Sequence, residues 1–224
     1  MFSKIYRSLK YRFNRFLHEN IIFQFKSKND VFTSIWKNNY WGDAESLSGP
    51  GSTIEYTEEI RIKLPTMLLE KDIISIFDAP CGDFNWMRYI VKENSVEYLG
   101  GDIVDELIQE NKKKYASKHI KFRKFDLTSD TFPEADVWLA RAVFYHLSNR
   151  EIYQALEQFV SSNIKYLLTT NHITDASHVN RDIKTGDWRL LNLCLPPFNF
   201  SKEPLWEIND YIEPSSCNII FMDT

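Results

Sequence analysis

Three aspartates follow short apolar runs at regular intervals, and each can accept hydrogen bonds from a ligand. Asp78 ends the run over residues 73–77, Asp102 ends the one in YLGGDIV, and Asp126 ends the one in KFDLT. An acid about 20 residues after a glycine turn, here Asp102 after Gly82, accepts hydrogen bonds from both hydroxyls of a ribose. Asp126 can accept one from an exocyclic amine. The pattern predicts a site for a nucleoside-like ligand.

The turn after the first apolar run indicates which ligand of this kind fits. A pyrophosphate such as that of NAD needs three glycines and a bare helix N-terminus. Here Pro80 and Phe84 occupy positions where a side chain would block close approach to the backbone, and Asp83 would repel a phosphate. A cationic sulfonium fits better. We therefore expect S-adenosylmethionine, which has a ribose, an adenine and a positive centre but no phosphate.

With these motifs the sequence resembles the class I S-adenosylmethionine-dependent methyltransferases. The matching stretches are DAPCGDF, GGDIV, FDLT and DVWLARAVFYHLS, in the family's order, and the resemblance covers roughly residues 54–224. The chain is most similar to a bacterial subgroup with the pattern WG, ESxSGxGS, DAPCGDFNWM and GDWRxLNL, which is associated with modification of cell-surface saccharides.

The resemblance implies a role for each matching residue. It places Asp102 at the ribose, Asp126 and Leu127 beside the adenine, and Gly82 along the methionine portion. The full predicted cofactor set is Asp78, Pro80, Gly82, Asp83, Asp102, Ile103, Asp126, Leu127 and Arg141. Because Pro80 and Phe84 replace two family glycines, the methionine end is expected to be held differently. The alternative for any single aspartate is a helix N-cap, and Cys81 is expected to be a packing residue.

Methyl transfer requires an acceptor atom in line with the sulfur to methyl bond, and a hydroxyl acceptor also benefits from a general base. We expect His146 and Arg141 to be the catalytic residues; the alternative for His146 is a cap on the following helix. Guanidinium groups suit an anionic or polyhydroxyl acceptor. The predicted acceptor-binding residues are Trp41, Ser52, His172, Asp187, Trp188 and Arg189. The alternatives are an Asp187–Arg189 pair that only fixes its segment, and surface-loop roles for His172 and His178.

These residues need a sheet that brings strand ends together. Short apolar runs predict strands near residues 73–78, 96–101, 119–125, 136–141 and 164–170, with helices near 84–93, 104–117 and 149–162. This alternation predicts an α/β fold with a doubly wound, mostly parallel sheet, whose ligands bind beyond the carboxyl ends of the strands. Runs near 205–208 and 218–222 are expected to add antiparallel edge strands. A helix is expected to run toward Leu69, with Ser52 or Thr53 as its N-cap and Glu55 in capping-box position. Pro65 is expected to bend this helix.

An N-terminal extension, residues 1–53, is expected before a methyltransferase domain over 54–224. Residues 1–28 contain seven Lys or Arg and one acid, although the whole chain has a net charge of −4. Their periodicity predicts a basic amphipathic helix that docks on the body or a second subunit, lies on a membrane surface, or is a cleavable targeting segment. The glycine and serine stretch within 31–57, edged by aromatics, is expected to be a lid, or alternatively a surface turn.

Composition excludes several classes of protein. Three widely spaced cysteines, Cys81, Cys194 and Cys217, argue against a disulfide framework and a zinc cluster, and no other metal site is expected. The acidic body disfavours a nucleic-acid-binding face. We expect a cytoplasmic O-methyltransferase, peripheral to the inner membrane face through residues 1–28, that acts on a sugar, sugar phosphate or nucleotide sugar for a surface polysaccharide. The alternatives are a phosphoryl-type or RNA acceptor, or a non-catalytic cofactor-binding partner.

Overall fold

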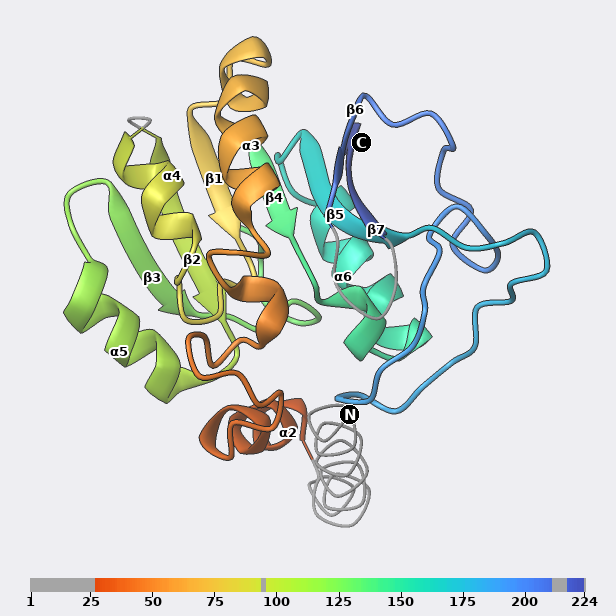
Figure 1. Cartoon of the computed structure of the whole chain (residues 1–224), viewed down its shortest axis with the longest axis horizontal. Coiled ribbons are helices and arrows are strands. Elements are labelled where there is room, and N and C mark those ends of the chain that lie inside the picture. Colours follow the sequence, from red (N-terminus) through yellow and green to blue (C-terminus); the bar gives the residue numbers. More distant parts are fainter. Residues whose placement is uncertain (1–26, 94–95, 211–216, 224) are drawn as a thin grey trace, which may run out of the picture.

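A seven-stranded sheet organises the chain in the computed structural model, which describes residues 27–93, 96–210 and 217–223 (Figure 1). The strand order is β3-β2-β1-β4-β5-β7-β6. The first five strands are parallel, so the predicted doubly wound α/β fold is confirmed; they are β1 (Ser75–Asp78), β2 (Glu97–Asp102), β3 (Ile120–Lys124), β4 (Val137–Ala140) and β5 (Tyr166–His172). The expected basic helix lies outside the described residues.

The two last strands are antiparallel neighbours, but only one forms an edge. β7 (Cys217–Asp223) pairs with β5 along its whole length, and β6 (Trp206–Asn209) pairs with the other side of β7. Ile219 and Phe221 are fully buried, so β7 is a central strand. The expectation of two edge strands is therefore wrong for β7, because its run of buried apolar residues requires cover on both faces.

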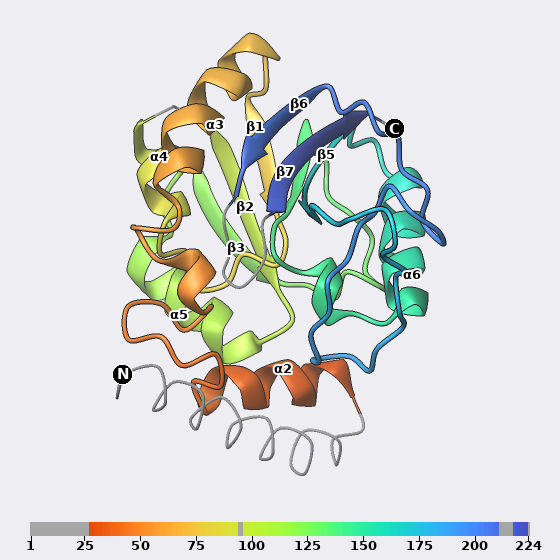
Figure 2. The same ribbon diagram turned by 45° about the vertical axis from the view of Figure 1, so that its right-hand side comes forward.

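Helices cover both faces of the sheet. The helices on the faces are α3 (Glu58–Glu70), α4 (Met87–Glu93), α5 (Asp105–Tyr115) and α6 (Asn149–Val160), and a further helix is α2 (Lys28–Lys37). Side chains of α3 and α4 join one buried cluster and side chains of α6 join the other. Successive side chains of β1 point to opposite faces of the sheet, so that Ile76 lies in the first cluster and Phe77 in the second. In Figure 2, α2 lies across the edge where the parallel strands end.

One helix start differs from expectation, and another, at α6, agrees with it. α3 begins at Glu58 rather than at Ser52 or Thr53; the Thr53 hydroxyl instead accepts a hydrogen bond from the Tyr56 amide in the preceding turn, 3.3 Å away. α6 is capped by Ser148 in a reciprocal capping box with Glu151. Since Ser148 supplies this cap, the alternative role of His146 as a helix cap is excluded.

Phe84 is a core residue rather than an obstruction at the first turn. It is 1% exposed, and its ring lies 4.8 Å from Tyr98 and 5.1 Å from Phe122, centroid to centroid. Its φ of 58° is in the left-handed region that favours glycine. The expectation that this side chain would block approach to the backbone is therefore wrong, because the ring points into the core.

Replacing Phe84 by alanine should lower the free energy of unfolding by about 3–5 kcal/mol, the usual cost of deleting a buried aromatic ring. Urea denaturation measures the change. Ile62→Ala on α3 is the control, since Ile62 is 67% exposed and its truncation should leave stability almost unchanged. A loss in Phe84→Ala no larger than that in the control would contradict the assigned packing.

Candidate functional site

The carboxyl ends of β1 and β2 hold the two best-defined acids of the site. Asp102 accepts a hydrogen bond at Oδ2 from the Gly82 amide, 3.2 Å away, and one at Oδ1 from the Val104 amide, 3.0 Å away. Each carboxylate oxygen keeps a second lone pair. Asp102 thus joins the first turn to the end of β2 and can still accept hydrogen bonds from a ligand.

Both acids are buried and costly to ionise. Burial raises the pKa of Asp78 to about 7, although the Tyr98 hydroxyl, donating over 2.7 Å, acts in the opposite direction. Burial likewise raises the pKa of Asp102 to about 6, against the lowering effect of its amide hydrogen bonds. The positive charge of Arg141 also lowers the pKa of Asp78, but by less than the Tyr98 hydrogen bond does. The pair therefore favours a nearby positive charge.

Asp126, expected beside an adenine, already has partners. Its Oδ2 lies 3.1 Å from the Lys28 ammonium at the start of α2, and its Oδ1 accepts hydrogen bonds from the amide and hydroxyl of Thr128. Burial raises the pKa of Asp126, but the hydrogen bonds from Thr128 and Lys28 outweigh burial and lower it below the ordinary value. The contacts of Asp126 are those of a turn-capping residue joined to α2.

A cavity of about 400 Å³ lies next to this ion pair. Its walls combine the ends of β2 and β3 with the start of α2: Ser27, Lys28, Asn29, Ile103, Lys124, Asp126 and Asp130. The volume is within the range of small-molecule sites. Ile103 and Asp126 were expected at such a site, whereas Lys28 and Asn29 were not, because nothing in their local sequence indicates a partner so far along the chain.

Asp83 is turned toward the expected lid rather than toward an open ligand site. Its carboxylate accepts hydrogen bonds from the Ser46 hydroxyl and the Leu47 amide, both at 2.9 Å, and from the Ser48 hydroxyl at 3.3 Å. The expected cofactor-binding role of Asp83 stays a prediction, and the carboxylate has a structural partner beside it. It anchors the loop over residues 46–48.

The same loop closes on the glycine of the turn. Gly82 has a φ of 54°, and a Cβ there would lie 2.2 Å from the Ser48 Oγ. The side-chain amide of Asn85 donates to the Glu45 carboxylate over 2.6 Å and to the Ser52 carbonyl over 3.0 Å. Ser52, expected at the acceptor, thus uses its main chain to hold the lid. Sequence reasoning missed Glu45 and Asn85, although both lie inside recognised motifs.

Arg141 is the centre of a buried clamp. Its guanidinium donates two hydrogen bonds to Asp210, at 2.9 and 2.7 Å, and one to the Gly51 carbonyl at 2.7 Å. It also lies over the Trp86 ring at 5.2 Å. Burial lowers the pKa of Arg141, but the Asp210 carboxylate outweighs burial, and the net shift is upward. These contacts favour a positioning role over the expected catalytic and cofactor-binding roles, because the charge is already neutralised.

Two expected acceptor-side residues meet on the other side of the clamp. His146 and Trp41 come from distant parts of the chain, yet their rings lie 5.3 Å apart (centroids). His146 Nδ1 is 2.8 Å from the Asp187 carbonyl oxygen, which can only accept a hydrogen bond. Nδ1 therefore carries a proton, and in an uncharged ring of this tautomer the lone pair is on Nε2. Asp187 contributes its carbonyl here, while its side chain is exposed.

The remaining expected residues have structural partners. His172 is 2% exposed between Tyr145 and Trp188, with ring centroids 5.0 and 6.0 Å away. Burial lowers the pKa of His172 to about 4, so it is neutral, and a surface-loop role for it is wrong. The Arg189 guanidinium donates to the Asn149 side chain at 2.7 Å and to the Leu147 carbonyl at 2.8 Å. Its acidic neighbour is Asp182 at 3.7 Å, which corrects the alternative pairing with Asp187.

The described residues contain neither a metal-binding cluster nor a membrane-spanning helix. No group of three or more His, Cys, Asp or Glu side chains there is arranged to hold a metal ion. No helix in that part of the chain is long and apolar enough to cross a membrane. Cys81 and Cys217 are buried and Cys194 is half-buried, all as free thiols. Burial raises the pKa of Cys81, as expected for a packing residue.

Several solved structures with a similar arrangement of strands and helices are methyltransferases. Magnesium protoporphyrin IX methyltransferase (ChlM) from Synechocystis PCC 6803, solved with S-adenosylmethionine bound, matches 88% of this chain and 97% of its own, with a TM-score of 0.57 and 12% identity. PigF, solved with S-adenosylhomocysteine, gives a TM-score of 0.61 at 9% identity over 86% of this chain. The chain has the fold of class I S-adenosylmethionine-dependent methyltransferases.

The likeness is one of fold. Human N-acetylserotonin methyltransferase, solved with S-adenosylmethionine, matches with a TM-score of 0.52, 13% identity and 88% of this chain. The match covers 57% of that protein and 62% of PigF, so this chain spans about three fifths of each. No protein-family model and no curated protein matches the sequence. At such identities the acceptor of a neighbour says nothing about the acceptor here.

Replacing Asp210 by alanine should destabilise the protein by about 3–5 kcal/mol, because Arg141 would remain buried without its counter-charge. Urea denaturation gives the change. Glu59→Ala, which breaks an exposed ion pair with Lys63, should have little effect. The double variant Arg141→Met with Asp210→Leu should recover part of the loss. A cost below 1 kcal/mol for Asp210→Ala would contradict the clamp.

Proposed function

We propose that this chain is a methyltransferase that transfers the methyl group of S-adenosylmethionine to a hydroxyl of a polar small molecule, with a sugar, sugar phosphate or nucleotide sugar as the favoured class. The observation that carries the proposal is Asp102. Its carboxylate is held by the Gly82 and Val104 amides at the edge where ligands of parallel sheets bind, next to the Ile103 and Asp126 cavity.

The residues of the site suit this cofactor. Asp102 would accept hydrogen bonds from the ribose hydroxyls, Ile103 and the region of Asp126 and Leu127 would adjoin the adenine, and the turn at Gly82 would adjoin the methionine portion. The buried carboxyls of Asp78 and Asp102 favour a cation and disfavour a phosphate. When bound, the cofactor would supply an electrophilic methyl group.

The acceptor would lie beside His146 and Trp41. His146 would accept the hydroxyl proton at Nε2 while the hydroxyl oxygen forms its new bond to the methyl carbon, and the Asp187 carbonyl would stabilise the resulting imidazolium through Nδ1. The partly exposed Trp41 and Trp188 rings offer apolar faces that suit the C–H face of a sugar ring. These features support a saccharide acceptor.

Two alternatives have weaker support. An RNA or phosphoryl-type acceptor would need Lys and Arg at the site, where Arg141 and Arg189 are instead bound to protein groups. A non-catalytic cofactor-binding partner would not need the orientation that Asp187 gives to His146. The seven basic residues of segment 1–28 support contact with an anionic membrane surface or a second subunit, and we propose the cytoplasm as the location.

S-adenosylhomocysteine should bind the wild-type chain, and Asp102→Ala should bind it at least about tenfold more weakly, because charge-assisted hydrogen bonds contribute about 1.5–3 kcal/mol each. Titration calorimetry measures both. Asp105→Ala, an exposed acid at the start of α5, is the matched control and should bind normally. Failure of the wild type to bind, or equal binding by Asp102→Ala, would refute the cofactor assignment.

Cofactor binding should release protons near neutral pH. With a pKa of about 7, Asp78 is half protonated at pH 7, and a sulfonium nearby stabilises its carboxylate and lowers that pKa, so roughly half a proton should leave per cofactor bound. Calorimetry in phosphate and Tris, whose ionisation enthalpies differ, counts the protons. The release should diminish toward pH 9 because Asp78 is then already ionised.

Two variants isolate Asp78 in this measurement. Asp78→Asn should remove the release, whereas Tyr98→Phe should extend it to higher pH, since losing the Tyr98 hydroxyl raises the Asp78 pKa further. Wild type and Asp78→Asn with identical proton counts at pH 7 would show that Asp78 does not respond to the cofactor.

Replacing His146 by alanine should lower kcat by about 10²–10⁴, the usual contribution of a general base, with cofactor affinity nearly unchanged. Transfer of labelled methyl to a panel of nucleotide sugars and sugar phosphates measures the rate. His178→Ala is the control, since His178 contacts Asn180 away from Trp41. Full activity of His146→Ala would remove His146 from the mechanism.

A further inference from the structure

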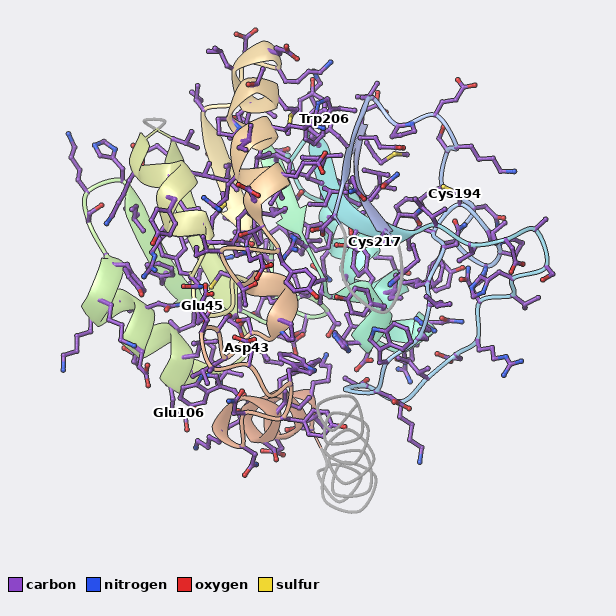
Figure 3. All side chains as sticks on the ribbon, viewed as in Figure 1. Asp43, Glu45, Glu106, Cys194, Trp206 and Cys217 are labelled. Atoms are coloured by element: carbon purple, nitrogen blue, oxygen red, sulfur yellow. The ribbon has the colours of Figure 1, made fainter. Side chains whose placement is uncertain are left out.

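A second cavity, of about 310 Å³, lies beyond the carboxyl end of β5 and is distinct from the cavity at α2. One wall is the β5, β7 and β6 part of the sheet, and the other is the irregular segment 173–205 that joins β5 to β6. Figure 3 labels Cys194 on this segment, well away from Glu45 of the lid. We call this cavity the β5 groove.

The wall formed by the irregular segment is a built structure. Asn180, 9% exposed, donates through Nδ2 to the carbonyls of Asn192 and Pro196, at 2.8 and 2.9 Å, and accepts at Oδ1 from the Asn192 amide at 3.0 Å. One buried side chain thus fixes three main-chain groups. Long irregular segments held inside a compact domain commonly form binding surfaces.

The lining combines side-chain amides with few charges. Asn171, Asn192 and Asn218 contribute carboxamides, each of which can donate to and accept from a hydroxyl. The Asn218 Nδ2 donates one of its hydrogens to Glu207 Oε1, 2.7 Å away, and the other remains for a ligand. An amide donor beside a carboxylate acceptor can bind two neighbouring hydroxyls of a sugar, donating to one and accepting from the other.

Apolar atoms and the charge balance narrow the ligand class further. Ile220, 3% exposed, lines the groove together with Leu195 and Pro204, so that an apolar surface lies beside the polar groups. Acids outnumber bases in the lining, with Asp175 and Glu207 against Lys202, which disfavours a phosphate or nucleotide. A neutral polyhydroxyl ligand with an apolar ring face meets both conditions.

Ring contacts link one wall of the β5 groove to the acceptor side of the proposed active site. His172 lines the groove, and its ring contacts Tyr145 at 5.0 Å and Trp188 at 6.0 Å. Tyr145 in turn contacts His146 at 4.5 Å. The groove and the proposed base therefore belong to neighbouring parts of one side-chain cluster.

We propose that the β5 groove binds saccharide units adjacent to the one that is methylated, so that the sugar acceptor of the proposed function is one unit of an oligosaccharide. The inference rests on the proposed function for the methyl-transfer step. Binding of the oligosaccharide itself needs only the groove.

Saturation-transfer NMR and titration calorimetry with a panel of defined bacterial surface oligosaccharides, each paired with its component monosaccharides, test this inference. The wild-type chain should bind at least one oligosaccharide at least tenfold more tightly than its monosaccharides. Glu207→Gln and the groove-filling Ser201→Trp should each weaken that binding at least fivefold. Both residues are exposed, and the variants should fold normally.

Matched controls outside the lining keep the test specific. Glu203→Gln and Ser177→Trp alter exposed residues of the same segment and should bind like the wild type. No preference for any oligosaccharide over its monosaccharides, or equal binding by the groove variants and their controls, would overturn the inference.

Binding of S-adenosylhomocysteine separates this inference from the proposed function. All four groove and control variants should bind it with wild-type affinity. A chain that binds oligosaccharides through the groove but not S-adenosylhomocysteine would refute the proposed function alone, whereas the reverse result would refute the groove alone.

Discussion

The backbone of one turn, at Gly82, is fixed from three directions, and the geometry of the site depends on it. The Gly82 amide donates to Asp102 at the end of β2, its carbonyl accepts from Asn111 of α5 over 2.7 Å, and Ser48 of the lid lies where a Cβ would be. Only glycine satisfies all three conditions, because any side chain would displace the lid. A shift of this turn would move the Asp102 carboxylate and the lid together.

Three buried acids near this turn differ in how their charge is compensated. Asp210 accepts two hydrogen bonds from the Arg141 guanidinium, so its charge is compensated within the protein. Among the described residues, Asp78 accepts a hydrogen bond from the Tyr98 hydroxyl and Asp102 accepts hydrogen bonds from backbone amides, and burial raises both pKa values. A fold optimised for stability alone would replace such groups with apolar ones. Burying Asp78 and Asp102 without a cationic partner destabilises the fold, and a bound cation would offset this. The two acids are therefore stronger candidates for ligand binding than Arg141, whose charge is already paired.

The parts predicted well from sequence are those that local pattern determines. Alternating apolar runs gave all five parallel strands to within a few residues, and the spacing from Gly82 to Asp102 gave a real contact, because parallel strand ends must share an edge. The errors concern partners that are distant along the chain. Ser46 and Asp83 are 37 positions apart, and Arg141 and Asp210 are 69 apart. Residue type predicted that each would be polar and important, but only the tertiary fold determines whether a charge meets a ligand or another side chain.

The two sides of the proposed active site rest on different kinds of structure. The nucleoside side consists of strand ends and the start of α2, whose positions follow from the sheet. The acceptor side consists of Trp41, the turn at His146 and the segment 173–205, whose positions follow from individual hydrogen bonds such as those of Asn180 and Arg189. Substitutions in that segment can therefore change which acceptor fits without moving Asp102 or Gly82. The chemistry of methyl donation would be set by the sheet, and the choice of acceptor by the segment between β5 and β6.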